Sequence, residues 1–550
     1  MTTRAEEEEP RAQDGASDPH VWQLPTGALV RLAAVLATFV GLTAVPYLDE
    51  RLADYRYLDL IDPGPLVRAA TLQQPLHASP ALGVDPSAVA TMPGEALALD
   101  SLPGESALLA AAATMGDGVA PLEVAPAEAL AGVKPVALAG EGTTVVVGAA
   151  TPATQDGAAG VVPASLLVPI EALEGQTVWL EGAAGTLDSF YTAVSDLAHG
   201  RRELVRIAHY GDSHIANDGI THTIRVLLQR RFGDGGHGHV LGRSRTRWYR
   251  HKGVVRQASE GWVVRNFLGG SLSDGAYGHA GVAATGGAGQ WLQVGTTKSG
   301  PGSVASRFSL SYRAQGRAVV DVIVDGKLHE SVVVAAGSGD GVMTVVLADG
   351  LHRVRWRLRR GRLRVFGAVV ERSQGLVYDS LGVVGARASR WSHASKVHMD
   401  AQRAGRPIDL IVMNYGGNAR GDKVSGQRYR TRFREALDVL RGESVAAGNR
   451  PACLVLGPGD HGKRHRGRVI SDPRTLRLID WQRQVAREAG CAFFDVRAWM
   501  GGDGSMGRWV KAGLGWADYA HLTPRGDQQT GKAVYRALLG GMRDWLATQP

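Results

Sequence analysis

The sequence lacks the residues that mark several classes of protein. It contains only two cysteines, Cys453 and Cys491, which excludes a disulfide-rich scaffold and a four-cysteine zinc site. It has no zinc-finger spacing, RNP-like motif or basic heptad repeat, so nucleic acid is not an expected partner. Basic residues are scarce in the first 200 positions, where 7 Lys and Arg stand against 25 Asp and Glu. The remaining positions carry a basic excess, which can attract acidic polymers or surfaces.

The length and composition indicate a globular protein with more than one unit. A chain of 550 residues is longer than one compact core usually holds. Hydrophobic residues make up 44% and charged residues 21%, which argues against disorder of the whole chain.

The first 48 residues have the pattern of an acidic tail followed by a membrane anchor. Residues 1–26 are polar and include an acidic run, and Leu32 to Leu48 contains no charged side chain. Residues 27–48 are long enough for a short transmembrane helix. A buried helix or a cleaved signal peptide remains an alternative. Basic residues flank the segment equally, so their positions do not decide its orientation.

Residues 49–165 are rich in Ala, Pro and Gly and show no sustained helical or strand period. This composition predicts a flexible or loosely structured linker. The short run Val145–Val147 favours at most an isolated strand.

A serine follows the first buried strand of residues 166–248. The pattern predicts a helix at Thr186–Leu197, a strand at Leu204–His209 and a helix at Ile220–Phe232. Gly211-Asp212-Ser213 falls between the strand and the second helix, where a hydroxyl is exposed at the carboxyl edge of a sheet. Alone, this tripeptide would be read as an ordinary turn.

Two later segments supply partners for that serine. A strand predicted at 409–414 ends in Gly416-Gly417-Asn418, and Asp518-Tyr-Ala-His521 precedes a helix predicted at 528–546. A nucleophilic serine needs a neighbouring base, and a histidine base needs a carboxylate that fixes its tautomer.

These segments, in this order, resemble the SGNH hydrolases, also called the GDSL esterase family. The resemblance covers roughly residues 186–248 and 376–547, within hydrolase parts assigned to 166–248 and 376–550. It implies an α/β fold, a three-layer α/β/α flavodoxin-like domain, and carboxylic ester hydrolysis.

By this resemblance, Ser213 is the nucleophile, His521 the general base and Asp518 the carboxylate that orients it. The backbone N–H groups of Ser213 and Gly385 and the side-chain amide of Asn418 would form the oxyanion hole. Neither a metal nor an organic cofactor is expected. Two positions depart from the family pattern, because His214 replaces the usual leucine and the third block lacks its common threonine.

The remaining histidines and cysteines have plainer interpretations. His461 and His465 resemble a metal-binding tract without a completing ligand set, so a solvent-exposed loop is expected there. His237 and His239 are expected in a loop. Cys453 and Cys491 open two predicted buried strands and are interpreted as small buried thiols.

Residues 249–375 change to a pattern of strands and turns. Asp325-Gly326 between two apolar strands predicts a hairpin. In 352–365, Arg353, Arg355, Arg357 and Arg359 alternate with apolar residues, which predicts an Arg face toward solvent or, less favoured, an anionic glycan. An inserted β-sandwich at this position resembles the carbohydrate-binding-like unit of peptidoglycan O-acetylesterases.

The sequence therefore predicts a membrane-anchored serine esterase with its catalytic domain in the periplasm or outside the cell. The expected substrate is an O-acylated, preferably O-acetylated, cell-envelope carbohydrate such as peptidoglycan. An acetyltransferase with the same triad, a lipase or thioesterase, and a non-catalytic glycan-binding protein are the alternatives. The oligomeric state is left open.

Overall fold

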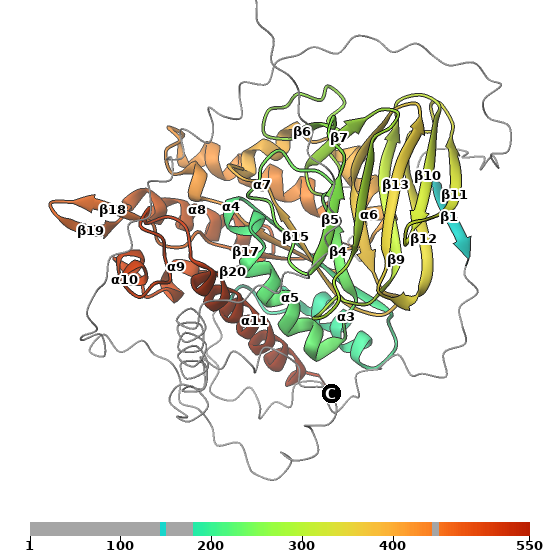
Figure 1. Cartoon of the computed structure of the whole chain (residues 1–550). Helices are drawn as coiled ribbons and strands as arrows, with labels where there is room; N and C mark the ends of the chain where they lie inside the picture. The colour runs from blue at the N-terminus through green and yellow to red at the C-terminus, as the bar shows by residue number, and fades with distance from the viewer. Residues whose placement is uncertain (1–142, 150–179, 443–449, 550) are drawn as a thin grey trace, which may run out of the picture. The chain divides into compact units, whose positions relative to one another are not determined.

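The computed structural model describes residues 143–149, 180–442 and 450–549 (Figure 1). The predicted acidic tail, the predicted anchor at 27–48 and most of the predicted linker lie outside these residues. Within the described ranges, no helix is both long enough and apolar enough to cross a membrane.

A six-stranded sheet forms the centre of the hydrolase part. Its order is β15-β3-β16-β17-β20-β2, with all neighbours parallel except β2 and β20. The bounds of its strands are β2 Leu180–Glu181, β3 Leu204–Gly211, β15 Gly375–Gly382, β16 Leu410–Asn414, β17 Ala452–Leu456 and β20 Ala492–Phe494.

Helices cover both faces of this sheet, because the central strands are apolar on both sides. On β16, Leu410 and Val412 pack into a core with one set of helices, and Ile411 and Met413 pack into a core with the other. The first set is α3 Asp188–Ala198, α5 Gly219–Phe232 and α11 Pro524–Leu546. The second set is α6 Lys396–Gly405, α7 Gly426–Arg441 and α8 Pro473–Glu488. The result is a layered α/β/α arrangement.

The register of three strands brings the predicted site segments to one edge. Gly211 at the end of β3 is paired with Gly382 of β15 and with Asn414 of β16. Parallel strands that end together place the following loops side by side. Ser213, Gly385 and Asn418 all lie in the loops or turns that follow these strand ends.

A two-sheet β unit is formed by the strands between β3 and β15 in the chain together with β1, which precedes β3. One sheet has the order β1-β12-β9-β14-β7-β6, with β4 also paired to β14, and the other has the order β11-β10-β13-β8-β5. Apolar side chains of both sheets share one core, which includes Trp356, Phe308 and Tyr312. The strands are β1 Thr143–Ala149, β4 Gly236–Val240, β5 Val254–Ala258, β6 Val263–Asn266, β7 Val282–Gly286, β8 Trp291–Thr296, β9 Ala305–Ala314, β10 Ala318–Val324, β11 Lys327–Val334, β12 Asp340–Gly350, β13 Arg353–Arg360 and β14 Leu363–Glu371.

The predicted hairpin is confirmed. Strands β10 and β11 pair across Asp325 and Gly326, whose φ angles of 49° and 85° are those of a two-residue hairpin turn. The Arg face of β13 is also present, since Val354, Trp356 and Leu358 are buried on its other side.

The chain itself neutralises much of this Arg face. Arg357 and Arg359 both form ion pairs with the buried Asp321, and Arg355 lies over the Trp291 ring at 4.2 Å from its centroid. The Arg side chains of this face are therefore held by contacts within their own sheet, as on an ordinary solvated surface.

Two expectations about local structure were wrong. His237 and His239 do not lie in a loop but in β4, where they are buried against β14, so the β unit includes a strand from the segment assigned to the hydrolase. The run at Val145–Val147 is not isolated, because β1 pairs in parallel with β12. In each case a distant strand supplies the partner.

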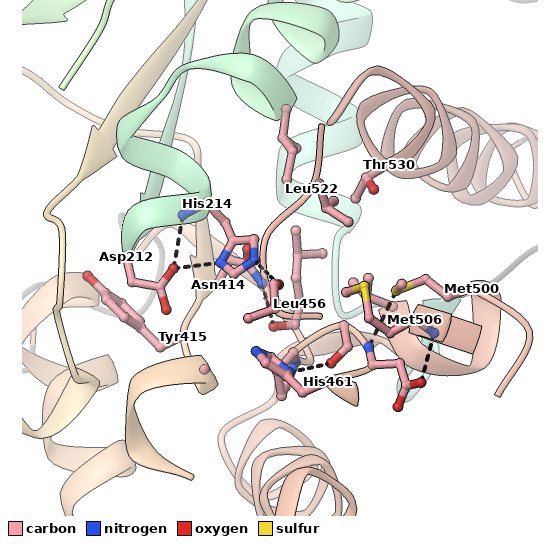
Figure 2. A pocket seen from close by; sticks show the side chains of 17 residues that line it. Asp212, His214, Asn414, Tyr415, Leu456, His461, Met500, Met506, Leu522 and Thr530 are labelled. Carbon is pink, nitrogen blue, oxygen red and sulfur yellow. Dashed lines mark hydrogen bonds and ion pairs between the residues drawn. The ribbon is translucent and has the colours of Figure 1, made fainter. Parts of the chain in front are cut away.

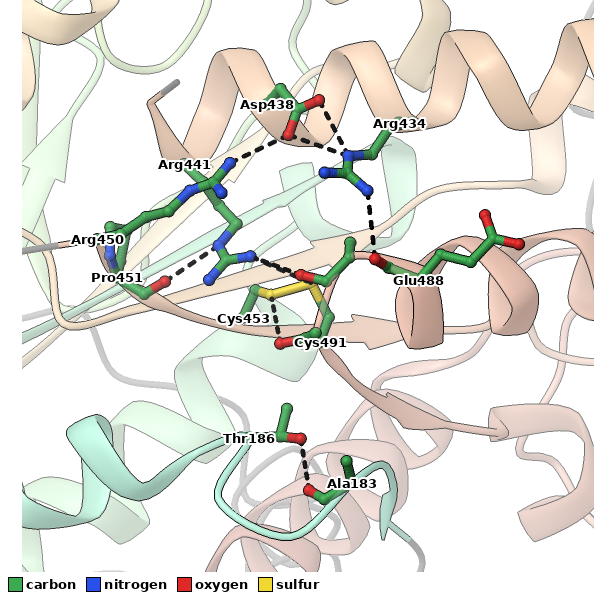
Figure 3. The surroundings of a disulfide bond; sticks show 12 residues. Ala183, Thr186, Arg434, Asp438, Arg441, Arg450, Pro451, Cys453, Glu488 and Cys491 are labelled. Carbon is green, nitrogen blue, oxygen red and sulfur yellow. Dashed lines mark hydrogen bonds and ion pairs between the residues drawn. A yellow bond between two sulfur atoms is a disulfide. The ribbon is translucent and has the colours of Figure 1, made fainter. Parts of the chain in front are cut away.

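The two cysteines form a disulfide rather than free thiols (Figure 3). Cys453 and Cys491 stand at the starts of the neighbouring strands β17 and β20, with their Cα atoms 4.8 Å apart. Both residues are buried, as expected. A cross-link over 38 residues removes chain entropy from the unfolded state and stabilises the fold by about 3–4 kcal/mol.

Candidate active site

Ser213 begins the short helix α4 (Ser213–Ala216) directly after β3. The turn needs glycine at position 211, since a Cβ there would lie 2.3 Å from a side-chain carbon of Ile215 and 2.9 Å from the Asn414 carbonyl oxygen. Asp212 caps the helix by accepting a hydrogen bond from the His214 N–H at 3.1 Å. This tight turn holds the Ser213 hydroxyl at the carboxyl edge of the sheet.

His521 reaches Ser213 from the loop that precedes α11. That helix begins with Pro524 at its first position and the Thr523 side chain as its cap, which fixes where the loop ends. The Ser213 hydroxyl donates to His521 Nε2 at 3.0 Å, and His521 Nδ1–H donates to Asp518 Oδ2 at 2.7 Å. The three residues that the sequence motifs predict for the site therefore lie together in the structure.

Asp518 is ionised at neutral pH. Burial alone would raise its pKa, but the hydrogen bonds from His521 and from the backbone N–H groups of His521 and Ala520 lower it to about 2. A carboxylate in this position keeps the proton of His521 on Nδ1 and stabilises the imidazolium when Nε2 accepts a second proton. Ser213 can therefore transfer its proton to His521.

Gly385 lies in a glycine-specific turn with open space beside its Cα. Its φ of 78° favours glycine, and a Cβ built there would meet nothing within 4 Å. It follows β15 closely, and the Val383 N–H bonds to the Gly211 carbonyl at 3.0 Å, so its turn lies beside the serine turn.

Asn418 lies in the short η7 helix (Gly417–Ala419) on the same edge. In this structure, its amide nitrogen donates to Asp212 Oδ2 at 3.3 Å and to the Ala386 carbonyl at 3.1 Å. Those bonds connect the serine turn, the Gly385 turn and the Asn418 turn. An oxyanion that accepted a hydrogen bond from the Asn418 amide would compete with Asp212 and with the Ala386 carbonyl for its N–H groups.

His214 is a component whose role the sequence analysis did not assign. Its Nδ1 lies 3.1 Å from Asp212 Oδ1 and its Nε2 lies 3.1 Å from the Ala520 carbonyl oxygen. Both partners accept hydrogen bonds, so both ring nitrogens donate and the ring is an imidazolium. Burial would lower the pKa of His214, but the bond and charge of Asp212 raise it to about 9. The ring stacks on His521 with centroids 5.1 Å apart.

A small cavity of about 30 Å³ lies beside His214 (Figure 2). Asp212, His214, Asn414 and His461 contribute to its lining, together with apolar side chains. This volume is on the order of one or two water molecules. It contains neither Ser213 nor His521, so it is not the place where the ester would bind.

His461 is not the solvent-exposed loop residue that the sequence predicted. It is 2% exposed, and its Nδ1–H donates to the Gly459 carbonyl at 3.0 Å. Its ring meets the His214 ring edge-on at a centroid distance of 6.3 Å. His465, four residues later, is exposed as expected. The strand Gly462–His465 begins directly after His461, so His461 stays inside the fold and His465 lies on the exposed strand.

Comparison with known families agrees with this geometry. The model of the GDSL-like lipase/acylhydrolase family matches residues 334–529, a range that contains Gly385, Asn418, Asp518 and His521. No curated protein matches the chain.

Among solved structures, one described as "Peptidoglycan O-acetylesterase in action, 5 min" matches with a TM-score of 0.56 and 20% identity. The match covers 66% of this chain and 99% of that one. A family two carbohydrate esterase from Cellvibrio japonicus matches with a TM-score of 0.21 and 11% identity, over 53% of this chain and 99% of its own. The salicylyl-acyltransferase SsfX3 matches with a TM-score of 0.25 and 15% identity, over 54% and 94%. Only the first of these three structures is close enough to show a shared fold.

The chain is a hydrolase of the carboxylic ester class. Residues 334–529 match a GDSL-like lipase/acylhydrolase domain.

Proposed function

We propose that the protein is an O-acetylesterase that removes acetyl groups from a cell-envelope glycan. The observation that carries this proposal is the continuous hydrogen-bonded chain from Ser213 through His521 to Asp518. The shared fold with a peptidoglycan O-acetylesterase supports an O-acetylated glycan as the substrate.

The reaction would proceed in two halves. Ser213 Oγ attacks the acetyl carbonyl carbon while its proton passes to His521 Nε2, and the carbonyl oxygen becomes an oxyanion. The Ser213 and Gly385 N–H groups and the Asn418 amide stabilise that charge. The tetrahedral intermediate collapses, the C–O bond to the sugar breaks, and His521 protonates the sugar oxygen.

A water molecule then attacks the acetyl-serine with His521 as its base. Collapse of the second intermediate returns the proton to Ser213 Oγ and releases acetate. The side chains of His521 and Asp518 are 33% and 48% exposed, so water has access to the base. This access favours hydrolysis over transfer to a second sugar.

Purified protein incubated with O-acetylated peptidoglycan is expected to release free acetate without any added acceptor. Acetate measured by an enzyme-coupled assay should increase linearly with protein concentration. De-O-acetylated peptidoglycan is the control and should yield none. Acetyl groups that moved to an added oligosaccharide without free acetate would instead identify a transferase, and hydrolysis confined to long-chain esters would identify a lipase.

The proposed location is the periplasm or the cell exterior, with residues 27–48 as the membrane anchor. The Cys453–Cys491 disulfide supports it, because such bonds persist in oxidising compartments and are rare in the cytosol. Alkaline phosphatase fused after Pro550 is therefore expected to be active in intact cells, and β-galactosidase at the same point inactive. The opposite pair of results would place the catalytic part in the cytoplasm.

A further inference from the structure

A basic hairpin projects from the hydrolase part beside the triad. Strands β18 (Gly462–His465) and β19 (Arg468–Ser471) pair antiparallel and project from the hydrolase part in Figure 1. Their exposed side chains include four that are basic, namely Lys463, Arg464, Arg466 and Arg468. In the described part of the chain, no acidic side chain forms an ion pair with any of the four. This differs from the Arg face of β13, whose charges Asp321 partly neutralises.

The hairpin is attached to the catalytic turn itself. The Gly462 N–H donates to the Tyr519 carbonyl at 2.8 Å, and Tyr519 lies between Asp518 and His521. A Cβ at Gly462 would lie 2.8 Å from Tyr519 Cβ, so the two segments approach as closely as glycine allows. The Arg464 guanidinium donates to the Tyr519 hydroxyl at 3.2 Å and lies 5.4 Å from the centroid of its ring. These contacts fix the distance between the hairpin charges and His521.

The same turn exposes a large aromatic side chain. The Trp516 side chain is 51% exposed, and the Trp516 backbone N–H donates to the His521 carbonyl at 2.9 Å. Its exposed indole offers a flat apolar surface on the catalytic turn. The apolar C–H face of a sugar ring is suited to a flat indole, and the indole N–H can bond to a hydroxyl.

We propose that hairpin β18–β19 and Trp516 form a binding subsite for an anionic glycan. The basic side chains bind carboxylates or phosphates of the acylated polymer, and Trp516 packs against a sugar ring near the ester. Arginine suits these anions because its planar fork donates two parallel hydrogen bonds to them. A basic rim attracts a polyanion from a distance and raises its local concentration at Ser213. This inference rests on the proposed esterase function and specifies its substrate as a charged polymer.

A charge-removal variant tests the subsite. Lys463→Gln, Arg466→Gln and Arg468→Gln are combined, and Arg464 is kept because it contacts the catalytic turn. The matched control removes three exposed charges of the β unit through Arg317→Gln, Lys327→Gln and Arg362→Gln. Three substrates are compared: O-acetylated polygalacturonate, O-acetylated dextran, and p-nitrophenyl acetate, which is too small to reach the hairpin.

The hairpin variant is expected to lose about tenfold in kcat/KM on acetylated polygalacturonate at low salt. Its activity on acetylated dextran and on p-nitrophenyl acetate should stay within about twofold of the wild type. The loss should shrink in about 0.5 M NaCl, where the Debye length falls below about 5 Å. The control variant should keep full activity on all three. Equal losses on all three substrates, or no loss on polygalacturonate, would overturn the proposal.

A binding measurement separates this inference from the proposed function. Fluorescently labelled polygalacturonate without acetyl groups is titrated with a Ser213→Ala protein that carries either the native or the changed hairpin. Weaker binding by the changed hairpin supports the subsite even if no ester is hydrolysed. Stronger competition by polyphosphate than by unlabelled polygalacturonate would assign phosphates as the recognised groups, and competition by neutral dextran alone would overturn the role of charge.

Discussion

Replacing Ser213 with alanine is expected to lower kcat for ester hydrolysis by about 10⁴-fold or more. The substitution removes the hydroxyl that bonds to His521 Nε2 and that would carry the acyl group. Any remaining hydrolysis would rely on the oxyanion donors and on direct attack by water. Turnover of p-nitrophenyl acetate by the purified variant measures the effect, and labelling by a fluorophosphonate should be lost in parallel.

Two further variants make this result specific. Asp518→Asn should also reduce kcat strongly, because a neutral amide neither fixes the His521 tautomer nor stabilises its cation. Ser338→Ala, which removes a hydroxyl bonded to the Ala335 carbonyl in a turn of the β unit, should keep full activity. The free energy of unfolding of Ser213→Ala, measured by urea titration, should match that of the wild type within about 0.5 kcal/mol. A variant that retained most of its turnover would exclude Ser213 as the nucleophile.

The parts of this fold that the sequence predicts are those that local pattern determines. The strand that ends at Gly211 and the helix that follows Ser213 each have an unbroken apolar period, and both formed close to the expected bounds. The Asp325-Gly326 turn is specified by residues that tolerate positive φ. The triad was identified because Ser213 and His521 occur in recognisable short motifs.

The features that the sequence did not predict depend on partners far away in the chain. The disulfide requires β17 and β20 to be neighbours in the sheet, an order that neither Cys453 nor Cys491 reveals in its own surroundings. His214 becomes a cation because its second acceptor is the carbonyl of Ala520, on the catalytic turn. His461 is buried by packing around the cavity, although its flanking residues are basic and polar.

Acidification from pH 7 to pH 5 is expected to destabilise the folded protein strongly. Five buried histidines have pKa values that desolvation lowers strongly: those of His209 and His239 to about 3, that of His251 to about 4, and those of His237 and His461 well below the ordinary 6.5. Below pH 6.5 the unfolded chain binds protons at these positions and the folded chain does not. Stability is therefore present above pH 6.5 and is lost as the pH falls toward the folded-state values.

The expected loss of stability is large because all five histidines destabilise the folded protein as the pH falls. Each histidine contributes up to about 1.4 kcal/mol per pH unit, or about 2 kcal/mol between pH 7 and pH 5. The five together reach the range of about 5–15 kcal/mol that stabilises a typical domain. His214, whose pKa is raised to about 9, acts in the opposite direction. Its contribution grows by only about 0.8 kcal/mol over this interval, so it does not offset the loss.

His251 provides the sharpest test of this account. Neither of its ring nitrogens has a hydrogen-bond partner among the described residues, so His251→Phe removes a titrating group without breaking a bond. The difference in unfolding free energy between variant and wild type, measured by urea titration, should rise by about 2 kcal/mol in favour of the variant from pH 7 to pH 5. The exposed His465 changed to Phe is the matched control and should leave the pH dependence unaltered. Parallel pH profiles for His251→Phe and the wild type would show that burial of this ring does not cause the loss of stability in acid.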